Sequence, residues 1–104
     1  MQIKWLRSAL QDLMELAEYI AQDNPTAAGE QFQRVERAVQ SLRGQPEQGR
    51  PSTVPGLREL VVAKTPFVVP YRVKEDRVEI LAVFHGALDW RRRLDNRAQE
   101  RTST

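Results

Sequence analysis

The single histidine, His85, is the residue whose side chain could most directly exchange protons near neutral pH. General acid–base catalysis needs a second titrating group within hydrogen-bond reach, and the sequence offers Glu59, Lys64 and Tyr71 as candidates. His85 follows an apolar run, so we expect its side chain at the rim of the fold. A structural hydrogen bond to a neighbouring loop explains a histidine there more simply than catalysis does.

Residue types exclude most other catalytic and metal chemistries. The chain has no cysteine, which removes disulfides, thiolate nucleophiles and sulfur-ligated metal sites. One histidine cannot build a typical zinc site, and the sequence has no glycine-rich phosphate loop. No base partner is evident for Ser52, Thr53 or Thr65, which disfavours a serine-type triad. We therefore expect no metal and no cofactor.

The basic residues are unevenly distributed along a chain whose net charge is +2. Residues 1–40 carry four basic and six acidic groups, whereas residues 41–104 carry twelve basic and eight acidic groups. The positive half favours an anionic partner, which could be a nucleic acid, an acidic peptide or an acidic protein groove. Solvated surface is the alternative explanation.

The candidates for contacting a target are basic or aromatic residues of the second half: Arg58, Arg72, His85, Trp90, Arg91, Arg92 and Arg93. Adjacent strand residues point to opposite faces, so Arg58 and Glu59 diverge, and we expect at least one of them in a structural ion pair. Arg72 alternates with Tyr71, and if it emerges on the face away from the helices it could form a basic patch with Arg58. Trp90 is a candidate partner anchor. The arginines after it form either a solvated tail or a contact with DNA or an acidic partner.

Two amphipathic helices are predicted in the first half of the chain. Apolar residues recur at helical spacing along residues 9–20, and we expect Ser8 to be the N-cap of this helix. Asn24 and Pro25 suit the N-cap and first position of a second helix, which is expected to end at Gly44. The short connection between the helices predicts a helical hairpin.

Four strands are predicted, separated after the helices by a loop rich in proline and glycine: residues 2–5, 57–63, 67–74 and 77–84. Pro70 cannot donate to a ladder, so it should face an edge or a bulge. The predicted fold is α+β, in the order β-α-α-β-β-β. The helical hairpin should pack on one face of a small, mostly antiparallel sheet, and the first strand should pair with one of the later three.

A length of 104 residues fits one domain. We expect this domain to span residues 1–90 and residues 91–104 to form an arginine-rich tail, either a short helix or disordered. No apolar run approaches the ~20 residues of a membrane-spanning helix, and the N-terminal segment lacks the uninterrupted apolar core of a signal peptide. The expected location is the cytoplasm, with no membrane contact.

The order of elements and a set of residues resemble the ParE/RelE toxin superfamily of bacterial type II toxin–antitoxin modules. The matching residues lie within residues 3–90: Trp5, Ala9, Asp12-Leu13, Tyr19-Ile20-Ala21, Asn24-Pro25, Pro46, Gly49-Arg50-Pro51, Pro55-Gly56-Leu57-Arg58-Glu59-Leu60, Tyr71-Arg72-Val73, His85-Gly86-Ala87 and Trp90. The resemblance implies a RelE/ParE-like fold and one of two mechanisms. RelE-like members cleave ribosome-bound mRNA through attack of a 2′-hydroxyl without a metal, whereas ParE-like members poison DNA gyrase.

Val68 separates these two mechanisms. The RelE-like pattern has an arginine three residues before the tyrosine of the middle late strand, and here the residue three before Tyr71 is Val68. A valine cannot neutralise a phosphate. After the last strand, the RelE-like cluster of arginine with tyrosine is replaced by His85-Gly86-Ala87-Leu88. The resemblance therefore implies a ParE-like inhibitor of DNA gyrase without catalytic residues. The alternative is a ribosome-dependent mRNA interferase that uses Lys64, Arg72 and His85.

The resemblance also implies protein partners. A cognate antitoxin is expected to silence the toxin by laying an amphipathic helix and an extended segment over it, in a hetero-oligomer. DNA would be bound indirectly, through the antitoxin. A third interpretation is an inactive or weakly toxic member that serves mainly as an antitoxin-binding and operon-regulating module. A short reading frame immediately upstream should encode the antitoxin.

Overall fold

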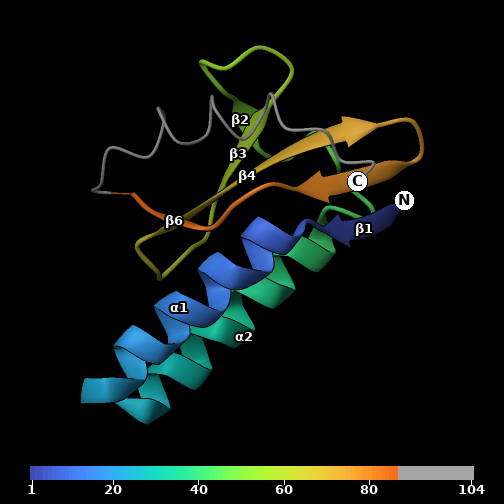
Figure 1. Cartoon of the computed structure of the whole chain (residues 1–104). Helices are drawn as coiled ribbons and strands as arrows, with labels where there is room; N and C mark the ends of the chain where they lie inside the picture. Colours follow the sequence, from blue (N-terminus) through green and yellow to red (C-terminus); the bar gives the residue numbers. More distant parts are fainter. Residues whose placement is uncertain (87–104) are drawn as a thin grey trace.

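The structure, a computed structural model, describes residues 1–86. Two helices and six strands make up this part of the chain (Figure 1): β1 (Gln2–Trp5), α1 (Arg7–Asp23), α2 (Pro25–Ser41), β2 (Arg50–Pro51), β3 (Arg58–Val61), β4 (Phe67–Lys74), β5 (Arg77–Ile80) and β6 (Phe84–His85). Residues 87–104 lie outside the described part, and with them the predicted tail.

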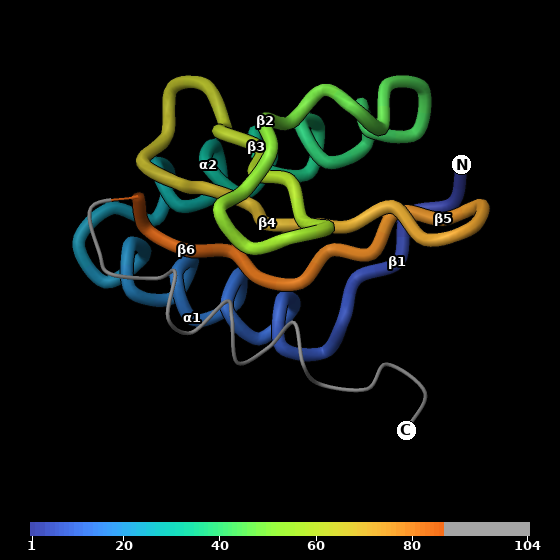
Figure 2. The backbone as a smooth tube through the Cα atoms, turned by 90° about the horizontal axis from the view of Figure 1, so that it is seen from above, coloured from blue at the N-terminus to red at the C-terminus, as the bar shows by residue number. Residues whose placement is uncertain are grey.

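The strands form one sheet in the order β1-β5-β4-β3-β2, and β6 pairs with β4 beyond the end of β5. Strand β1 runs parallel to β5, and all other pairs are antiparallel. The helical hairpin covers one face of this sheet, as Figures 1 and 2 show from two directions. The α+β prediction is confirmed, as is the pairing of the first strand with a later one.

The two helices are joined at Asn24, which ends α1 and caps α2. The Asn24 side-chain oxygen accepts a hydrogen bond from the Ala27 amide at 3.1 Å, and Pro25 occupies the first helical position. These contacts satisfy a helix N-terminus whose amides have no intrahelical acceptors. The predicted helical hairpin is therefore confirmed at its turn. No helix of the described part is long and apolar enough to span a membrane.

Two predicted helix caps are wrong. Helix α1 begins at Arg7, and the residue in the N-cap position is Leu6, which makes no side-chain cap bond. The Ser8 hydroxyl instead donates to the Leu81 carbonyl oxygen at 3.0 Å, a tertiary bond that local sequence does not reveal. Helix α2 ends at Ser41 with Leu42 at its C-cap, so Gly44 lies in the turn beyond the helix.

The single strand predicted for residues 77–84 is also wrong, because it is split into β5 and β6. Pro70 explains the break. It lies in the central strand β4, at the point where pairing with β5 ends, and its carbonyl accepts from the Leu81 amide at 3.0 Å. Since proline has no amide hydrogen, it cannot return a bond to the Leu81 carbonyl. The Ser8 hydroxyl supplies that bond instead. Pro70 thus faces an interruption of the ladder, as expected.

The loop predicted at residues 45–56 contains a strand that sequence patterns missed. Strand β2 is only two residues long, and it pairs with β3 through Arg50 opposite Glu59 and Pro51 opposite Arg58. A proline at the edge of a sheet is tolerated because its missing amide would face solvent. Strand β2 thereby becomes one edge of the sheet, and β1 is the other.

The core has two parts, one on each face of the sheet. The larger part packs the hairpin against the sheet and includes Leu13, Val35, Val39, Tyr71 and Ile80. The smaller part lies on the opposite face and consists of five buried residues: Leu57, Val68, Leu81, Ala82 and Phe84. Its existence means that this face carries a packed apolar cluster as well as polar surface.

Candidate interaction surfaces

Arg58 and Arg72 lie on opposite faces of the sheet, so the predicted patch formed by both is wrong. Arg58 is directly opposite Tyr71 in the β3–β4 ladder, and Tyr71 belongs to the core beneath the helices. Arg72, the next residue along β4, therefore points to the other face. The Arg58 guanidinium donates to the Gly49 carbonyl at 2.7 Å and to the Glu47 carbonyl at 3.3 Å. Its observed contacts hold the loop before β2.

Tyr71 fixes the same loop from inside the core. Its hydroxyl accepts from the Gly49 amide at 2.8 Å and donates to the Pro46 carbonyl at 2.8 Å. Burial raises the pKa of the Tyr71 hydroxyl above its usual value, against smaller lowering effects of the Gly49 hydrogen bond and the Arg58 charge. A Cβ at Gly49 would lie 2.7 Å from the Tyr71 hydroxyl oxygen, so this close approach requires glycine. The Tyr71 hydroxyl thus holds the loop before β2 with both of its hydrogen bonds.

On the face away from the helices, a buried carboxylate holds two arginines. The side chain of Glu79 is 0% exposed, with Arg72 Nε at 2.6 Å from one carboxylate oxygen and Arg77 Nε at 2.9 Å from the other. Burial alone would raise the pKa of Glu79, but the hydrogen bonds and charges of Arg72 and Arg77 outweigh it and lower this pKa. We call these three residues the Arg72–Glu79–Arg77 clamp. Of the predicted target-binding residues, Arg72 alone belongs to it.

Glu59 is the second acidic group buried on this face, and it forms the expected ion pair. Arg50 Nε lies 3.2 Å from a Glu59 carboxylate oxygen across the β2–β3 pair. The pairing confirms the prediction that at least one of Arg58 and Glu59 serves the structure. A buried carboxylate without such a partner would be strongly destabilising.

Val68 lies in the apolar cluster of the face away from the helices. It is 6% exposed and stands directly opposite Phe84 in the β4–β6 pair and opposite Val61 in β3. An arginine in this position would have to place its guanidinium among Leu57, Leu81 and Phe84. Burying a guanidinium group there without a partner would cost several kcal/mol of stability, because the charge would lose its hydration. The local packing thus suits valine.

The three residues of the nuclease alternative do not come together. His85 stands opposite Phe67 at one end of β4, with their rings in edge-to-face contact at a centroid distance of 6.4 Å. Arg72 is five residues further along β4, about 17 Å at ~3.3 Å per residue, and it points to the opposite face. Lys64 is an exposed residue of the β3–β4 turn, with φ of 63°. Arg72 is thus remote from His85, whereas Lys64 is in the turn that leads to Pro66, whose carbonyl accepts from the Gly86 amide at 2.7 Å.

The helical hairpin carries a shallow apolar groove on its outer surface. The groove has a volume of about 410 Å³ and is lined by residues of both helices: Met14, Ala17, Glu18, Ala21, Ala28, Gly29 and Phe32. Met14 is 66% exposed and Tyr19 is 71% exposed, which is unusual for large apolar side chains on a helix. We call this surface the hairpin groove. Sequence patterns missed it because its alanines continue the apolar stripe that was assigned to the core.

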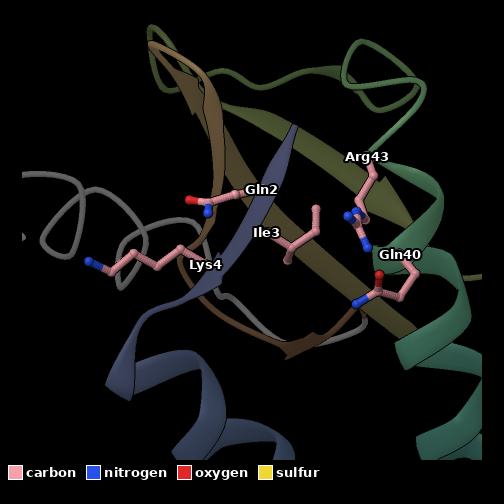
Figure 3. Close-up of a pocket in the computed structure, with 5 residues that line it drawn as sticks. All are labelled: Gln2, Ile3, Lys4, Gln40 and Arg43. Atoms are coloured by element: carbon pink, nitrogen blue, oxygen red, sulfur yellow. The ribbon is translucent and has the colours of Figure 1, made fainter.

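A polar pocket of about 390 Å³ lies between the edge strand β1 and the end of α2. Figure 3 shows Ile3, Gln40 and Arg43 on one side of β1, and Lys4 and Gln2 on the other. The N-terminal ammonium group donates to the Arg43 carbonyl at 3.2 Å beside this pocket. The described lining has two cationic side chains, Lys4 and Arg43, and no carboxylate, histidine or hydroxyl group to pair with them in acid–base chemistry.

The remaining candidates are outside the described part of the chain. Trp90, Arg91, Arg92 and Arg93 lie beyond residue 86. Within residues 1–86, no group of three or more metal-ligating side chains is present.

Comparison with known proteins decides the family. The family described as the ParE toxin of type II toxin–antitoxin system, parDE, matches residues 3–90. This chain is a member of the ParE toxin family. It is 42% identical over 88 residues to the candidate toxin Y4kP of Sinorhizobium fredii, covering 85% of this chain and 91% of that protein. As a member of this family, it is the toxin component of a type II toxin–antitoxin module.

Two further relatives place the chain in the same superfamily of toxins. Toxin RelE2 of Caulobacter vibrioides is 41% identical over 86 residues, which cover 83% of this chain and 96% of that protein. A solved structure described as the chromosomal ParDE TA system from P. aeruginosa superposes with a TM-score of 0.77 and 34% identity. That match covers 82% of this ParE-family chain and 95% of the solved one. The predicted superfamily and its ParE-like branch are thereby confirmed.

Sequence reasoning missed Arg77 and Glu79 as members of the clamp. One signal could have found them, because Glu79 is a lone acid within the apolar run from Val78 to Phe84. An acid that is buried needs a cation within reach. Arg72 is opposite Glu79 only in one register of β4 and β5. That register depends on the length of the turn between the two strands.

Proposed function

We propose that this ParE-family toxin acts by binding and inhibiting DNA gyrase, and that it does not cut RNA. The carrying observation is Val68, whose side chain packs in an apolar cluster at the position where the nuclease pattern has an arginine. Stabilising the charge of a phosphoryl transition state needs a cation aimed at it. A valine in that place favours a binding surface over a catalytic one.

The separation of Arg72 from His85 supports the same proposal. His85 is directly opposite Phe67, on the face of the sheet that the helices cover. Arg72 is bound by Glu79 on the other face. Catalysis by proton transfer needs groups within about 3 Å of the reacting atoms, directly or through one water. Because Arg72 and His85 are on opposite faces, they do not support such catalysis in the cytoplasmic toxin that we propose.

The gyrase proposal is tested with purified toxin, gyrase and relaxed plasmid. We expect supercoiling to stop and cleaved plasmid to accumulate in proportion to added toxin. Heat-denatured toxin serves as the control for carried-over contaminants. Unchanged supercoiling at saturating toxin would refute the proposal for this chain.

The second candidate is a ribosome-dependent mRNA interferase, which is favoured by the name of one relative, Toxin RelE2. In a cell-free translation system this activity would produce defined cuts in ribosome-bound message. His85→Gln should then abolish cutting, because His85 is the one imidazole that the sequence provides. Intact message together with gyrase inhibition would eliminate the interferase.

We further propose that a cognate antitoxin neutralises the toxin by placing a helix in the hairpin groove. Gly29 is the main support. It lies inside α2, where glycine costs about 1 kcal/mol relative to alanine. A Cβ built on Gly29 would meet nothing within 4 Å, so packing within the described part of the chain does not require glycine. Close approach of an external helix backbone would require it.

The charge of the hairpin indicates what kind of helix would bind. Between residues 11 and 33 the chain has five acidic residues and no lysine or arginine. Glu15, Glu18 and Glu30 are exposed around the apolar groove. A helix with an apolar stripe flanked by lysine and arginine is complementary to this surface, in the helix-in-groove mode. A second copy of the same acidic hairpin would be repelled.

Replacement of Gly29 tests the antitoxin surface. Gly29→Leu should fill the groove and weaken binding of the co-expressed antitoxin by at least tenfold, about 1.4 kcal/mol. Gly44→Leu is the matched control, since Gly44 is equally open but lies beyond α2 and outside the groove. Equal affinity of both variants, measured by titration calorimetry, would exclude the hairpin groove. The antitoxin should also carry the hetero-oligomer to its operator DNA.

A further inference from the structure

The Arg72–Glu79–Arg77 clamp holds two guanidinium groups through their Nε atoms, at 2.6 Å and 2.9 Å from the Glu79 carboxylate oxygens. Each arginine donates to Glu79 through Nε. The Nη groups of both arginines donate to no residue of the described part of the chain. The side chains of Arg72 and Arg77 are 18% and 29% exposed, so each arginine keeps part of its surface open to a ligand. Guanidinium forks with free Nη donors are suited to bidentate contact with a phosphate.

Two lysines extend the positive charge around the clamp. Lys4 of β1 is directly opposite Glu79, and Lys74 of β4 is directly opposite Arg77. Both lysines are exposed. Figure 3 shows Lys4 on the side of β1 away from α2, which agrees with a position on the clamp face. One carboxylate is thus surrounded by four cations from three strands.

Surface composition favours a nucleic-acid backbone over an acidic protein. Protein interfaces concentrate their binding energy in buried apolar and aromatic anchors. The large apolar side chains most exposed in the described part, Met14 and Tyr19, lie on the hairpin, and Val61 of β3 is two strands away from β5. Phosphate contacts need no such anchor.

Within residues 1–86, the lack of an aromatic platform beside the clamp favours duplex DNA over single-stranded RNA. Recognition of single strands depends on stacking bases against aromatic side chains. The only aromatic residue that is exposed among residues 1–86 is Tyr19, which lies on α1, whereas the clamp is on the face of the sheet away from the helices. A duplex presents its phosphates without unstacking any base.

The charges of the two layers would orient the toxin toward such a polyanion. The hairpin has five acidic residues and no basic ones between residues 11 and 33, whereas the clamp face is positive. The resulting dipole directs the sheet face to DNA and the hairpin away from it. Glu75 and Asp76 at the tip of the β4–β5 turn oppose this attraction and set the limit of the contact surface.

We propose that Arg72 and Arg77, positioned by Glu79 and supported by Lys4 and Lys74, bind the phosphate backbone of duplex DNA. This inference rests on the proposed inhibition of gyrase, because it gives the toxin a direct contact with the DNA that the enzyme holds. The antitoxin-facing hairpin groove remains free in this arrangement, since it is on the other layer of the molecule.

Direct binding of the full-length toxin to a short labelled duplex of mixed sequence tests the proposal by fluorescence anisotropy. The double variant Arg72→Gln with Arg77→Gln should weaken binding by at least tenfold and reduce the slope of log affinity against log salt by about 2. The double variant Arg72→Lys with Arg77→Lys keeps the charge but loses the forks, and it should weaken binding several-fold. Arg37→Lys, on the exposed surface of α2, should change nothing.

Glu79→Gln separates a positioned site from simple attraction. The substitution raises the net charge by one, so attraction alone would strengthen DNA binding. Loss of the carboxylate that aligns both arginines should instead weaken it. Glu75→Gln with Asp76→Asn should strengthen binding, because it removes the opposing charges at the turn. Melting curves of each variant establish that it is folded, and if Glu79→Gln is not, the arginine-to-lysine pair decides.

Unchanged affinity in the arginine variants would overturn the proposal. So would tighter binding of single-stranded RNA than of duplex DNA, or displacement of DNA by poly-glutamate at equal charge concentration. Supercoiling inhibition is measured separately on the same variants. DNA binding without gyrase inhibition would refute the proposed target and retain the DNA site. Gyrase inhibition by a toxin that binds no DNA would refute the DNA site and retain the proposed target.

Discussion

At the scale of single residues, the side chains that look reactive are engaged in holding the fold. Tyr71 and Arg58 both bind the loop before β2, and Glu79 is shared by two arginines. His85 packs its ring edge against Phe67. Residue type alone suggested acid–base candidates, but each candidate's partners decide its role. Those partners come from strand register, which single residues do not reveal.

Tyr71→Phe should show how much the loop depends on one hydroxyl. The variant loses the bonds to Gly49 and Pro46, and it should lower the free energy of unfolding by about 1–3 kcal/mol in urea denaturation. Tyr19→Phe, an exposed position, is the control and should leave stability unchanged. Equal stability of the two variants would show that the loop is held by other contacts.

The raised pKa of Tyr71 gives this residue a signature in alkaline solution. Its folded pKa lies above the value of 10.0 for a free tyrosine. The unfolded chain therefore loses this proton first, and the contribution to stability is full below pH ~10 and falls as pH rises through the folded pKa. Tyr71→Phe should remove this part of the alkaline decline. An identical decline in both proteins would contradict the burial effect.

At the scale of elements, the hairpin and the pairing of the first strand with a later one were predictable, whereas the full strand order and the interruptions were not. Asn24-Pro25 marks a helix start by local chemistry, and structure agrees. The split between β5 and β6 depends on Pro70, β5 and Ser8 at once. Sequence placed Pro70 at an edge or a bulge, but only the folded chain shows which hydroxyl takes the vacant bond.

A double-mutant cycle tests this exchange between Pro70 and Ser8. Ser8→Ala alone leaves the Leu81 carbonyl without the hydroxyl, and we expect a loss of about 1 kcal/mol of stability. In the Pro70→Ala background, the new amide can donate to the same carbonyl, so Ser8→Ala should cost less. A coupling energy of zero in thermal denaturation would show that the two residues act independently.

Gly29→Ala should separate stability from binding within α2. Alanine removes the conformational cost of glycine and should stabilise the free toxin by about 0.5–1 kcal/mol. The same methyl group lies in the proposed antitoxin contact and should weaken the complex. Gly44→Ala provides the matched control for binding. A variant that is less stable alone would mean that Gly29 serves the fold of the hairpin itself.

At the scale of the whole molecule, charge is divided between the two layers. The helical layer is acidic around its groove, and the face of the sheet away from the helices carries Arg72, Lys74 and Arg77. The sequence already showed this division, as a negative first half and a positive second half. It could not show that the halves would form opposite layers, which required the hairpin to cover a single face of the sheet. The two proposed partners, an antitoxin helix and DNA, would therefore not compete for the same charges.

This division of charge predicts that salt and substitutions in the hairpin groove change different rate constants of antitoxin binding. A basic antitoxin helix is steered by the acidic hairpin, so its association rate should fall by roughly tenfold or more from low to high ionic strength. Its dissociation rate should change little, because that rate is governed by apolar contacts in the groove. Gly29→Leu should do the opposite and mainly raise the dissociation rate. Stopped-flow binding of the co-purified antitoxin distinguishes the two effects. An association rate that is insensitive to salt would mean that the acidic residues around the hairpin groove do not face the antitoxin.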